Sequence, residues 1–565
     1  MNAITRLPLM LLVWLGIVPL AAAQSAPFRT ELLALLPDDF AVCVVMHDLR
    51  GHAARWGQSD WLKTFRASPV GKSFLDAPEM RQLERWQSEL KKHLDLDWPT
   101  LRDDILGDTL ILAYSPGPKN EPNSEPKDER GLFLLHVRKP DRLIQVIGKL
   151  NESQIKADKL KLTTHEYKGN TYYRRQEAGK TQFYIVKESL AAVATKEEIL
   201  QAFLDRRSAP AKDNPWAKRF QRAGAESAVF TMFVNPRKLD AEVLQNRKKD
   251  DPLSGYWRAL EAVFVSVAIQ DEAELRISIQ ANAGELPEWA KSAFTQTTPA
   301  SSLWQRFPER SILTIAARTD FAGAADALKL LMPEKDRKKL TTDWQGSIGA
   351  LLRLDPFKEI LPNIGPDWGI CVSPSKDAKQ LPQTMFALAV KPGSKDQPVD
   401  KSLFKAVELF AGIAVLDYNK KNPNSNMRLQ TVMQDKVEVT YLSNDKLFPP
   451  GFQPACALKD GFLLFASSPD AIVSFRLHER RPDERNETPL LRVSAPELAE
   501  LLEHRREHIL VTLTDRQQMS DKDAKKNLEN VIGLLGLFDH LTLSQHGNAS
   551  QASWSIRLTP ARPAN

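Results

Sequence analysis

Cysteine is scarce in this sequence, which has only Cys43, Cys371 and Cys456 among 565 residues. So few cysteines exclude a small disulfide-rich scaffold, in which several bridges replace a hydrophobic core. No Cys-x-x-Cys pair or mixed Cys and His spacing predicts a structural zinc site. Cys43 and Cys371 lie in apolar runs, so we expect all three thiols to be free and buried as small hydrophobic groups.

Charge of one sign is not in large excess either. The chain has 77 Lys and Arg against 71 Asp and Glu, for a net charge of +6. Short basic clusters at 247–249 and 335–339 have acidic neighbours, as on a solvated surface. Nucleic-acid-binding proteins gather basic residues on one face, so the composition predicts no nucleic-acid partner.

Long apolar runs occur only at the N-terminus. Arg6 precedes an apolar stretch from Leu7 to Leu20, and Ala21-Ala22-Ala23 follows. This order is typical of a secretory signal peptide, and the run is shorter than the ~20 residues of a membrane-spanning helix. We expect residues 1–23 to be cleaved, leaving a periplasmic or secreted protein without a transmembrane segment.

Most catalytic signatures are missing, including G-x-S-x-G, G-x-G-x-x-G and H-E-x-x-H. Gly71-Lys72-Ser73 resembles the end of a P-loop, but Arg66 stands where the first glycine is needed. His47-Asp48 could belong to a catalytic triad. Asp320 recurs at the corresponding place in a later segment, so we interpret Asp48 as a strand-end cap. These residues therefore predict no catalytic site and no cofactor.

One zinc-peptidase signature, H-x-x-E-H, is present at His504, Glu507 and His508. Such a site needs both histidines within one helix and a third protein ligand. The apolar run from Ile509 is typical of a strand, so we expect His508 at a helix–strand junction. No suitable third ligand follows, and we interpret the match as coincidence, with no metal site.

Two halves of the chain repeat the same kinds of segment in the same order. Each pair has similar apolar and polar spacing, and the paired segments begin at residues 36 and 307, 106 and 364, 131 and 384, 183 and 456, 228 and 508, and 263 and 541. In the fifth pair, AVFTMFVNPRKL is matched with HILVTLTDRQQM. Repetition in one order predicts an internal duplication.

The repeats predict two similar α+β domains, covering residues 24–297 and 298–565, each large enough for its own core. Their boundary lies in the small polar stretch from Thr295 to Ser302. Short apolar strands joined by tight turns favour a mainly antiparallel sheet packed with helices. Leu83, Trp86, Leu90 and Leu94 have helical spacing and predict a helix over 80–94 that packs this stripe on the core.

The leader, the LPDDFAVCVV opening, the Ser-Pro-x-Gly-Lys stretch and LAAVATKEEILQAFL together resemble uncharacterised secreted bacterial families of planctomycete type. The resemblance spans nearly the whole mature chain and implies a duplicated α+β protein of unknown function. It implies no catalytic or binding residue at any position.

We therefore expect an exported, non-enzymatic binding or structural protein of the cell envelope. Its partner would be another envelope protein, a polysaccharide or a lipid. One alternative is a carrier of lipids or other hydrophobic ligands, with a cavity between sheet and helices. A second alternative is a metal-dependent hydrolase that uses His504, Glu507 and His508.

Overall fold

The chain folds into two compact units in a computed structural model, one ending at Glu285 and the other running from Leu286 to Arg562. The structure describes residues 28–117, 129–157, 159–209, 214–244, 251–287, 290–291, 294, 299–332, 334–344, 346, 359–377, 380–392, 399–478, 487–548 and 550–561. The predicted signal peptide, residues 1–23, and the predicted domain boundary after residue 297 lie outside these residues.

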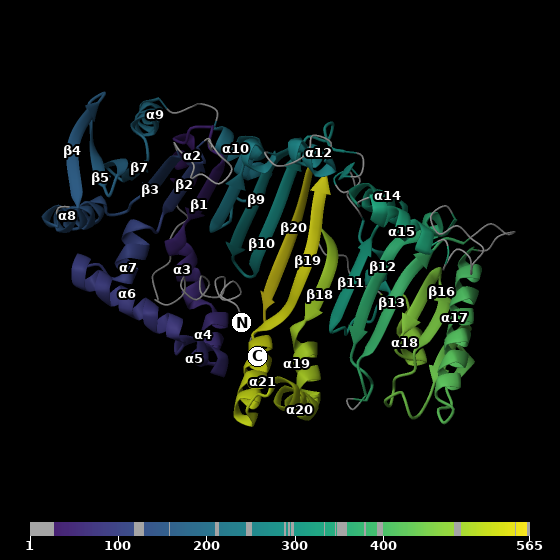
Figure 1. Ribbon diagram of the computed structural model, residues 1–565. Coiled ribbons are helices and arrows are strands. Elements are labelled where there is room, and N and C mark those ends of the chain that lie inside the picture. Colours follow the sequence, from purple (N-terminus) through teal and green to yellow (C-terminus); the bar gives the residue numbers. More distant parts are fainter. Residues whose placement is uncertain are drawn as a thin grey trace. The chain divides into compact units, whose positions relative to one another are not determined.

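The first unit contains an antiparallel ten-stranded sheet (Figure 1). From one edge to the other its strands are β4 (Leu160–Tyr167), β5 (Asn170–Glu177), β6 (Lys180–Lys187), β7 (Leu190–Ala194), β3 (Arg130–His136), β2 (Thr109–Ser115), β1 (Val42–His47), β8 (Phe230–Val234), β9 (Leu260–Ile269) and β10 (Ala273–Ala281).

One face of this sheet carries a large core, and a smaller cluster around Leu135, Val137 and Ala191 is buried on the other face. Cys43 on β1 lies opposite Ala113 of β2 and Phe233 of β8, and all three side chains are buried. Side chains alternate between the two faces of a strand, so these residues point the same way. Three helices cover them: α2 (Phe28–Ala34), α9 (Glu197–Ser208) and α10 (Pro215–Arg222). Trp216 of α10 packs edge-on against Phe233, with ring centroids 5.0 Å apart.

The second unit repeats this strand order with different residues. Its antiparallel sheet runs β14 (Arg428–Gln434), β15 (Val437–Ser443), β16 (Ala455–Lys459), β17 (Phe462–Ala466), β13 (Gln383–Val390), β12 (Ile364–Ser373), β11 (Leu313–Arg318), β18 (Thr488–Ser494), β19 (Phe538–Asn548) and β20 (Gln551–Pro560). The core of the second unit contains the buried residues Phe307, Cys371, Leu464 and Phe475.

The predicted α+β class and the antiparallel sheets are confirmed. Five of the six predicted segment pairs fall on strands that hold the same place in the two orders. The shared order is what an internal duplication requires, and the duplication itself stays a prediction. All three cysteines are free and buried, as expected.

The fifth pair was wrong. Residues 506–517 form helix α20 (Arg506–Gln517), and the strand that matches β8 is β18, earlier in the chain. Ile509, Leu510 and Leu513 have the i, i+1, i+4 spacing of a helix face, which a short apolar run does not distinguish from a strand. Proline is unusual inside a strand, so Pro489 made β18 hard to recognise in the sequence. The pairing of β18 with β19 shifts register between Pro489 and Leu491.

The other described helices are divided between the two units. In the first unit they are α3 (Leu49–Gln58), α4 (Asp60–Ala67), α5 (Pro69–Leu75), α6 (Pro78–Leu94), α7 (Trp98–Thr100), α8 (Pro140–Lys156), α11 (Asp240–Leu244) and α12 (Pro252–Ala259). In the second unit they are α14 (Phe321–Leu331), α15 (Glu334–Trp344), α17 (Val399–Lys421), α18 (Pro469–Ser474), α19 (Ala495–His504), α20 and α21 (Asp521–Leu535). No helix in the described ranges is long and apolar enough to cross a bilayer.

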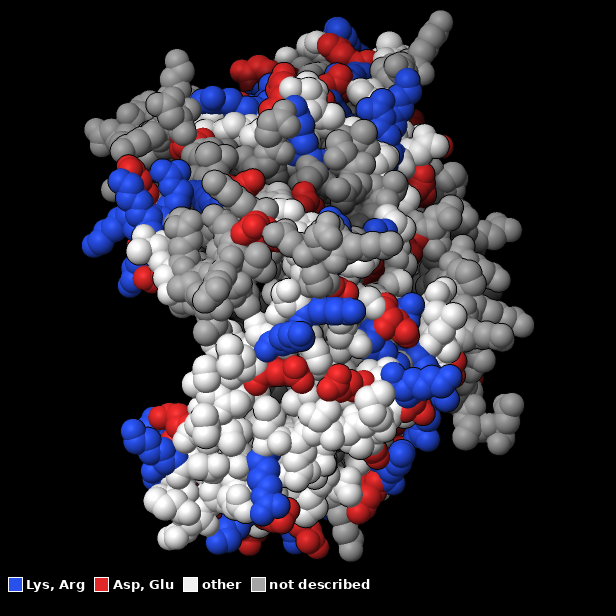
Figure 2. Space-filling view, turned by 90° about the vertical axis from the view of Figure 1, so that its right-hand side faces the viewer, with Lys and Arg blue, Asp and Glu red and all other residues white. Residues whose placement is uncertain are grey.

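Two helices leave apolar side chains at the surface. Helix α6 confirms the predicted helix, but Trp86 is 44% exposed and contacts Trp98, so the stripe is not wholly core. Helix α17 packs Phe404 and Val415 inward and exposes Leu409, Phe410, Ile413 and Leu416. Figure 2 shows the molecule from the side on which α17 lies. Uncharged residues cover much of the lower half of this view.

Candidate functional site

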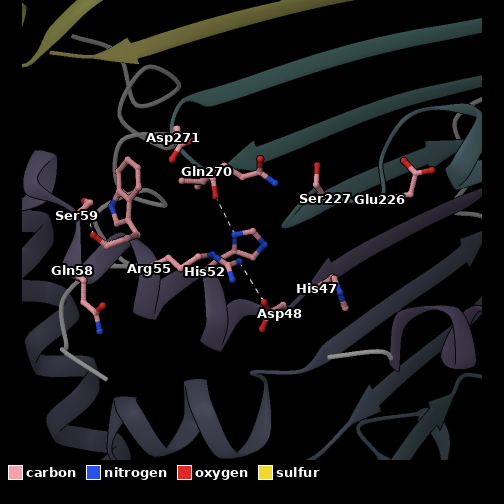
Figure 3. Close-up of a pocket in the computed structure, with 12 residues that line it drawn as sticks. His47, Asp48, His52, Arg55, Gln58, Ser59, Glu226, Ser227, Gln270 and Asp271 are labelled. Carbon is pink, nitrogen blue, oxygen red and sulfur yellow. Dashed lines mark hydrogen bonds and ion pairs between the residues drawn. The ribbon is translucent and has the colours of Figure 1, made fainter. Parts of the chain in front are cut away.

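An open pocket of about 730 Å³ lies in the first unit, where β1 ends and α3 begins (Figure 3). Three separate stretches of chain form it: the β1–α3 segment, the residues before β8, and the β9–β10 turn. The lining residues are His47, Asp48, His52, Arg55, Trp56, Gln58, Ser59, Glu226, Ser227, Ile269, Gln270 and Asp271.

Asp48 fixes the start of α3. Its backbone has a left-handed conformation, with φ 50°, and its Oδ1 accepts a hydrogen bond of 3.0 Å from the Gly51 amide. Arg55 Nη2 lies 3.4 Å from Oδ2 of the same carboxylate. Asp320 accepts from the Gly323 amide at 3.2 Å in the second unit, which confirms the interpretation of both residues as strand-end caps.

His52 is only 5% exposed and points into the pocket region from α3 (Figure 3). Its Nδ1 donates to the Ile269 carbonyl oxygen at 3.2 Å, so in the neutral ring Nε2 carries the lone pair. Burial, followed by the nearby Arg55 charge, lowers the pKa of His52. Within the described chain Nε2 has no hydrogen-bond partner, and it is therefore an available acceptor.

His47 is the last residue of β1 and supplies a second imidazole. Its Nδ1 lies 3.0 Å from the hydroxyl of Thr109 on the neighbouring strand β2. Burial, followed by the charges of Arg29 and His52, lowers the pKa of His47 to about 4. Both imidazoles are therefore uncharged at neutral pH, and the pocket gains no positive charge from them.

The charged groups that line this pocket are mainly acidic. Glu226 and Asp271 are exposed at its rim, and the Asp48 carboxylate is buried beside Arg55. Trp56 is buried, and its indole Nε1 has no hydrogen-bond partner in the described structure. The site therefore combines three carboxylates with one guanidinium and two neutral imidazoles, which favours a ligand that donates hydrogen bonds.

The serines of the pocket are not arranged for nucleophilic catalysis. Ser59 Oγ donates to the Trp56 carbonyl oxygen at 2.7 Å and caps α4 through the Leu62 amide. No hydrogen bond joins Ser59 or Ser227 to either imidazole among the lining residues. A nucleophile must lie within hydrogen-bond reach of its base, so the pocket does not contain a serine triad.

A cluster of polar side chains, largely buried, lies at the start of α3. Asp108, just before β2, pairs with Arg50 Nη2 at 2.8 Å and with His136 Nδ1 at 3.0 Å. The Asp108 carbonyl oxygen also accepts from the Asp48 amide at 2.6 Å. Since a buried charge must be paired, this cluster fixes the start of α3 to strands β2 and β3.

The H-x-x-E-H residues do not form a metal site. His504 ends α19, whereas Glu507 and His508 lie in α20, and all three side chains are exposed. Arg505 interrupts the helix between the two histidines. Across the described ranges no group of three His, Cys, Asp or Glu side chains could hold a metal ion.

Gly71-Lys72-Ser73 also has another role. It lies in α5, whose cap Ser68 accepts from the Gly71 amide at 3.0 Å, and helix α4 precedes it in place of a strand. A P-loop joins a strand to a helix, so this segment is not one.

The second unit has its own pocket of about 520 Å³ at the end of β11, beside the capping Asp320. There the last strand residue is Arg318, in the position that His47 has on β1. The two pockets therefore differ in charge although the cap between strand and helix is the same.

Sequence reasoning considered His47 and Asp48 but missed His52, Arg55, Glu226 and Asp271. These residues follow no motif, because three stretches far apart in the chain meet only in the folded sheet. A histidine four residues after a strand-end Asp was the available signal, and it is a weak one.

A family model described as a protein of unknown function, DUF3352, matches residues 80–412, more than half of the chain. The match covers parts of both units. No curated protein matches the chain.

Proposed function

The chain belongs to the DUF3352 family, whose function is unknown, and we propose from its site that it is an exported, non-enzymatic binding protein. In this proposal the first unit binds a small amine in the pocket at the end of β1. Export rests on the predicted signal peptide, and the envelope is the compartment we infer from it.

The unpartnered Nε2 of buried His52 carries the proposal. An ammonium group can donate to this lone pair and remain close to Glu226 and Asp271, which line the same pocket. Charge-assisted hydrogen bonds of this kind are stronger than neutral ones.

The two alternatives gain less support. The pocket is open and lined by carboxylates and imidazoles, which is unlike a cavity for an acyl chain. The exposed His504 and His508, in different helices, give a metal-dependent hydrolase no assembled site.

The test is thermal unfolding of the mature chain with putrescine, ethanolamine or glycerol. We expect the two amines to raise Tm and glycerol to leave it unchanged. The His52→Phe variant should lose the shift, whereas the surface variant His93→Gln on α6 should retain it. An equal response to glycerol, or an amine shift that survives in His52→Phe, would contradict the proposal.

Native mass spectrometry of protein from its own host gives a second test. We expect a chain that begins at Gln24 and retains an added mass of an amine. A chain that keeps residues 1–23 would contradict export.

A further inference from the structure

A second polar pocket, of about 300 Å³, lies wholly within the second unit. It is formed beside the β14–β15 hairpin and the starts of β13 and α18. Its volume is at the lower end of the ~300–1,000 Å³ of ligand pockets, so it suits a ligand of one sugar ring. The polar residues that line it include Gln380, Gln383, Gln434, Gln453, Tyr441 and Asp470.

The side-chain amides of this pocket are mostly unused. Gln383, Gln434 and Gln453 make no side-chain hydrogen bond to the described part of the chain, and Gln380 only accepts one from Ser375 at 3.2 Å. Oε1 of Gln434 is buried without a partner. A buried acceptor left unpaired is unfavourable, and a ligand hydroxyl could satisfy it.

The pocket carries little charge. Among the described residues no Lys or Arg side chain lines it, and the one carboxylate among them, Asp470, lies 3.4 Å from Lys376 Nζ at the surface. Tyr441 donates to Gln430 Oε1 at 2.5 Å, which fixes its ring at the side of the pocket. A phosphate or other anion would meet the Asp470 carboxylate, and the described basic group nearby, Lys376, is already paired with that carboxylate.

A carboxamide holds two donors and an acceptor in one plane, and each hydroxyl of a sugar both donates and accepts. Several amides around one small cavity therefore match a neutral, polyhydroxylated ring better than an ion or an apolar ligand. We propose that this pocket binds a neutral saccharide, through the amides of Gln383, Gln434 and Gln453. The proposal does not depend on the amine site of the first unit.

Saturation-transfer NMR and calorimetry on the full mature chain test this site. The probes are glucose, N-acetylglucosamine and its linear trimer, with glucose 6-phosphate as the charged comparator. We expect at least one neutral sugar to bind and glucose 6-phosphate to bind more weakly. Tighter binding of the trimer than of the monomer would identify a polysaccharide as the natural source, and equal binding would identify a free sugar.

Gln434→Leu should weaken sugar binding about tenfold, because it removes the amide at nearly constant shape. If the Gln434→Leu variant unfolds, Gln453→Ala, at an exposed position, provides the same test of sugar binding. Gln145→Leu on α8 is the matched surface control. His52→Phe should leave sugar binding unchanged, which separates this site from the proposed amine site. The inference is overturned if none of the neutral probes binds, or if Gln434→Leu and Gln453→Ala both retain wild-type affinity.

Discussion

At the level of single residues, the first-unit pocket depends on which ring nitrogen carries a proton. The carbonyl of Ile269 holds the proton on Nδ1 of His52, and burial keeps the ring neutral. His47 is kept neutral in the same way at the end of β1. The chemistry of the pocket is therefore set by backbone packing as well as by residue type.

His47 should make folding sensitive to acid. Its pKa is about 4 when folded and 6.5 when unfolded, so its contribution to stability is present above pH 6.5 and is lost as pH falls towards 4. We expect the wild type to lose roughly 2 kcal/mol more than His47→Asn between these limits, measured by urea unfolding. If the free energy of unfolding changes with pH in the same way in the wild type and in His47→Asn, the prediction for His47 is wrong.

The two capping aspartates offer a matched pair. Asp48 is buried and also meets Arg55, whereas Asp320 is exposed. Asp48→Ala should lower the free energy of unfolding by about 2 kcal/mol and Asp320→Ala by at most about 1 kcal/mol. Chemical denaturation of both variants checks this difference, and equal losses would contradict the role of burial.

At the level of helices and strands, the sequence predicted most of the sheets but not every element. Strands such as β1 and β3 are short and apolar, with turns around them, and were recognised on that pattern. Helix α20 was mistaken for a strand because its apolar run is too short to show its period. The pocket could not be predicted, since residues 47–59, 226–227 and 269–271 meet only through strand pairing.

Helix α17 allows a test of which face packs on the sheet. Val415 is buried and the adjacent Leu416 is 72% exposed. Val415→Asp should destabilise the protein by more than about 2 kcal/mol, whereas Leu416→Asp should change stability by at most about 0.5 kcal/mol. Thermal unfolding distinguishes them, and a large loss for Leu416→Asp would show that its side chain is covered in solution.

The break between α19 and α20 leads to a prediction about zinc. Since His504 and His508 lie in different helices and are exposed, zinc should not bind them as a peptidase site. We expect Tm to be the same with added zinc and with a chelator, for both the wild type and His508→Ala. A rise in Tm with zinc that His508→Ala abolishes would restore the metal hypothesis.

At the level of the whole molecule, the same order of ten strands occurs in both units although few of their residues are alike. Each unit has its own buried core, with the cysteines distributed between them. The sequence could predict this organisation because the order and spacing of the apolar segments are similar in the two halves. The planctomycete type suggested by the resemblance stays a prediction.

The buried thiols provide a test of both cores together. Burial raises the pKa of Cys43, and it raises the pKa of Cys456 to about 11, so neither forms a reactive thiolate at neutral pH. We expect a thiol reagent to leave the native protein unmodified and to label three cysteines after denaturation. Fewer labelled thiols in denaturant would reveal a disulfide, and rapid native labelling would show an open core.

The cap that begins α3 and α14 has a consequence for the strand ends beside it. At Gly51 and Gly323 a Cβ atom would lie 2.2 Å and 2.4 Å from an oxygen of the capping carboxylate, so this cap favours a glycine three residues after the Asp. The last residue of the preceding strand differs between the units: it is His47, directly before Asp48, in one, and Arg318, two residues before Asp320, in the other. The same Asp-to-Gly cap therefore stands beside an imidazole at one sheet end and beside a guanidinium at the other.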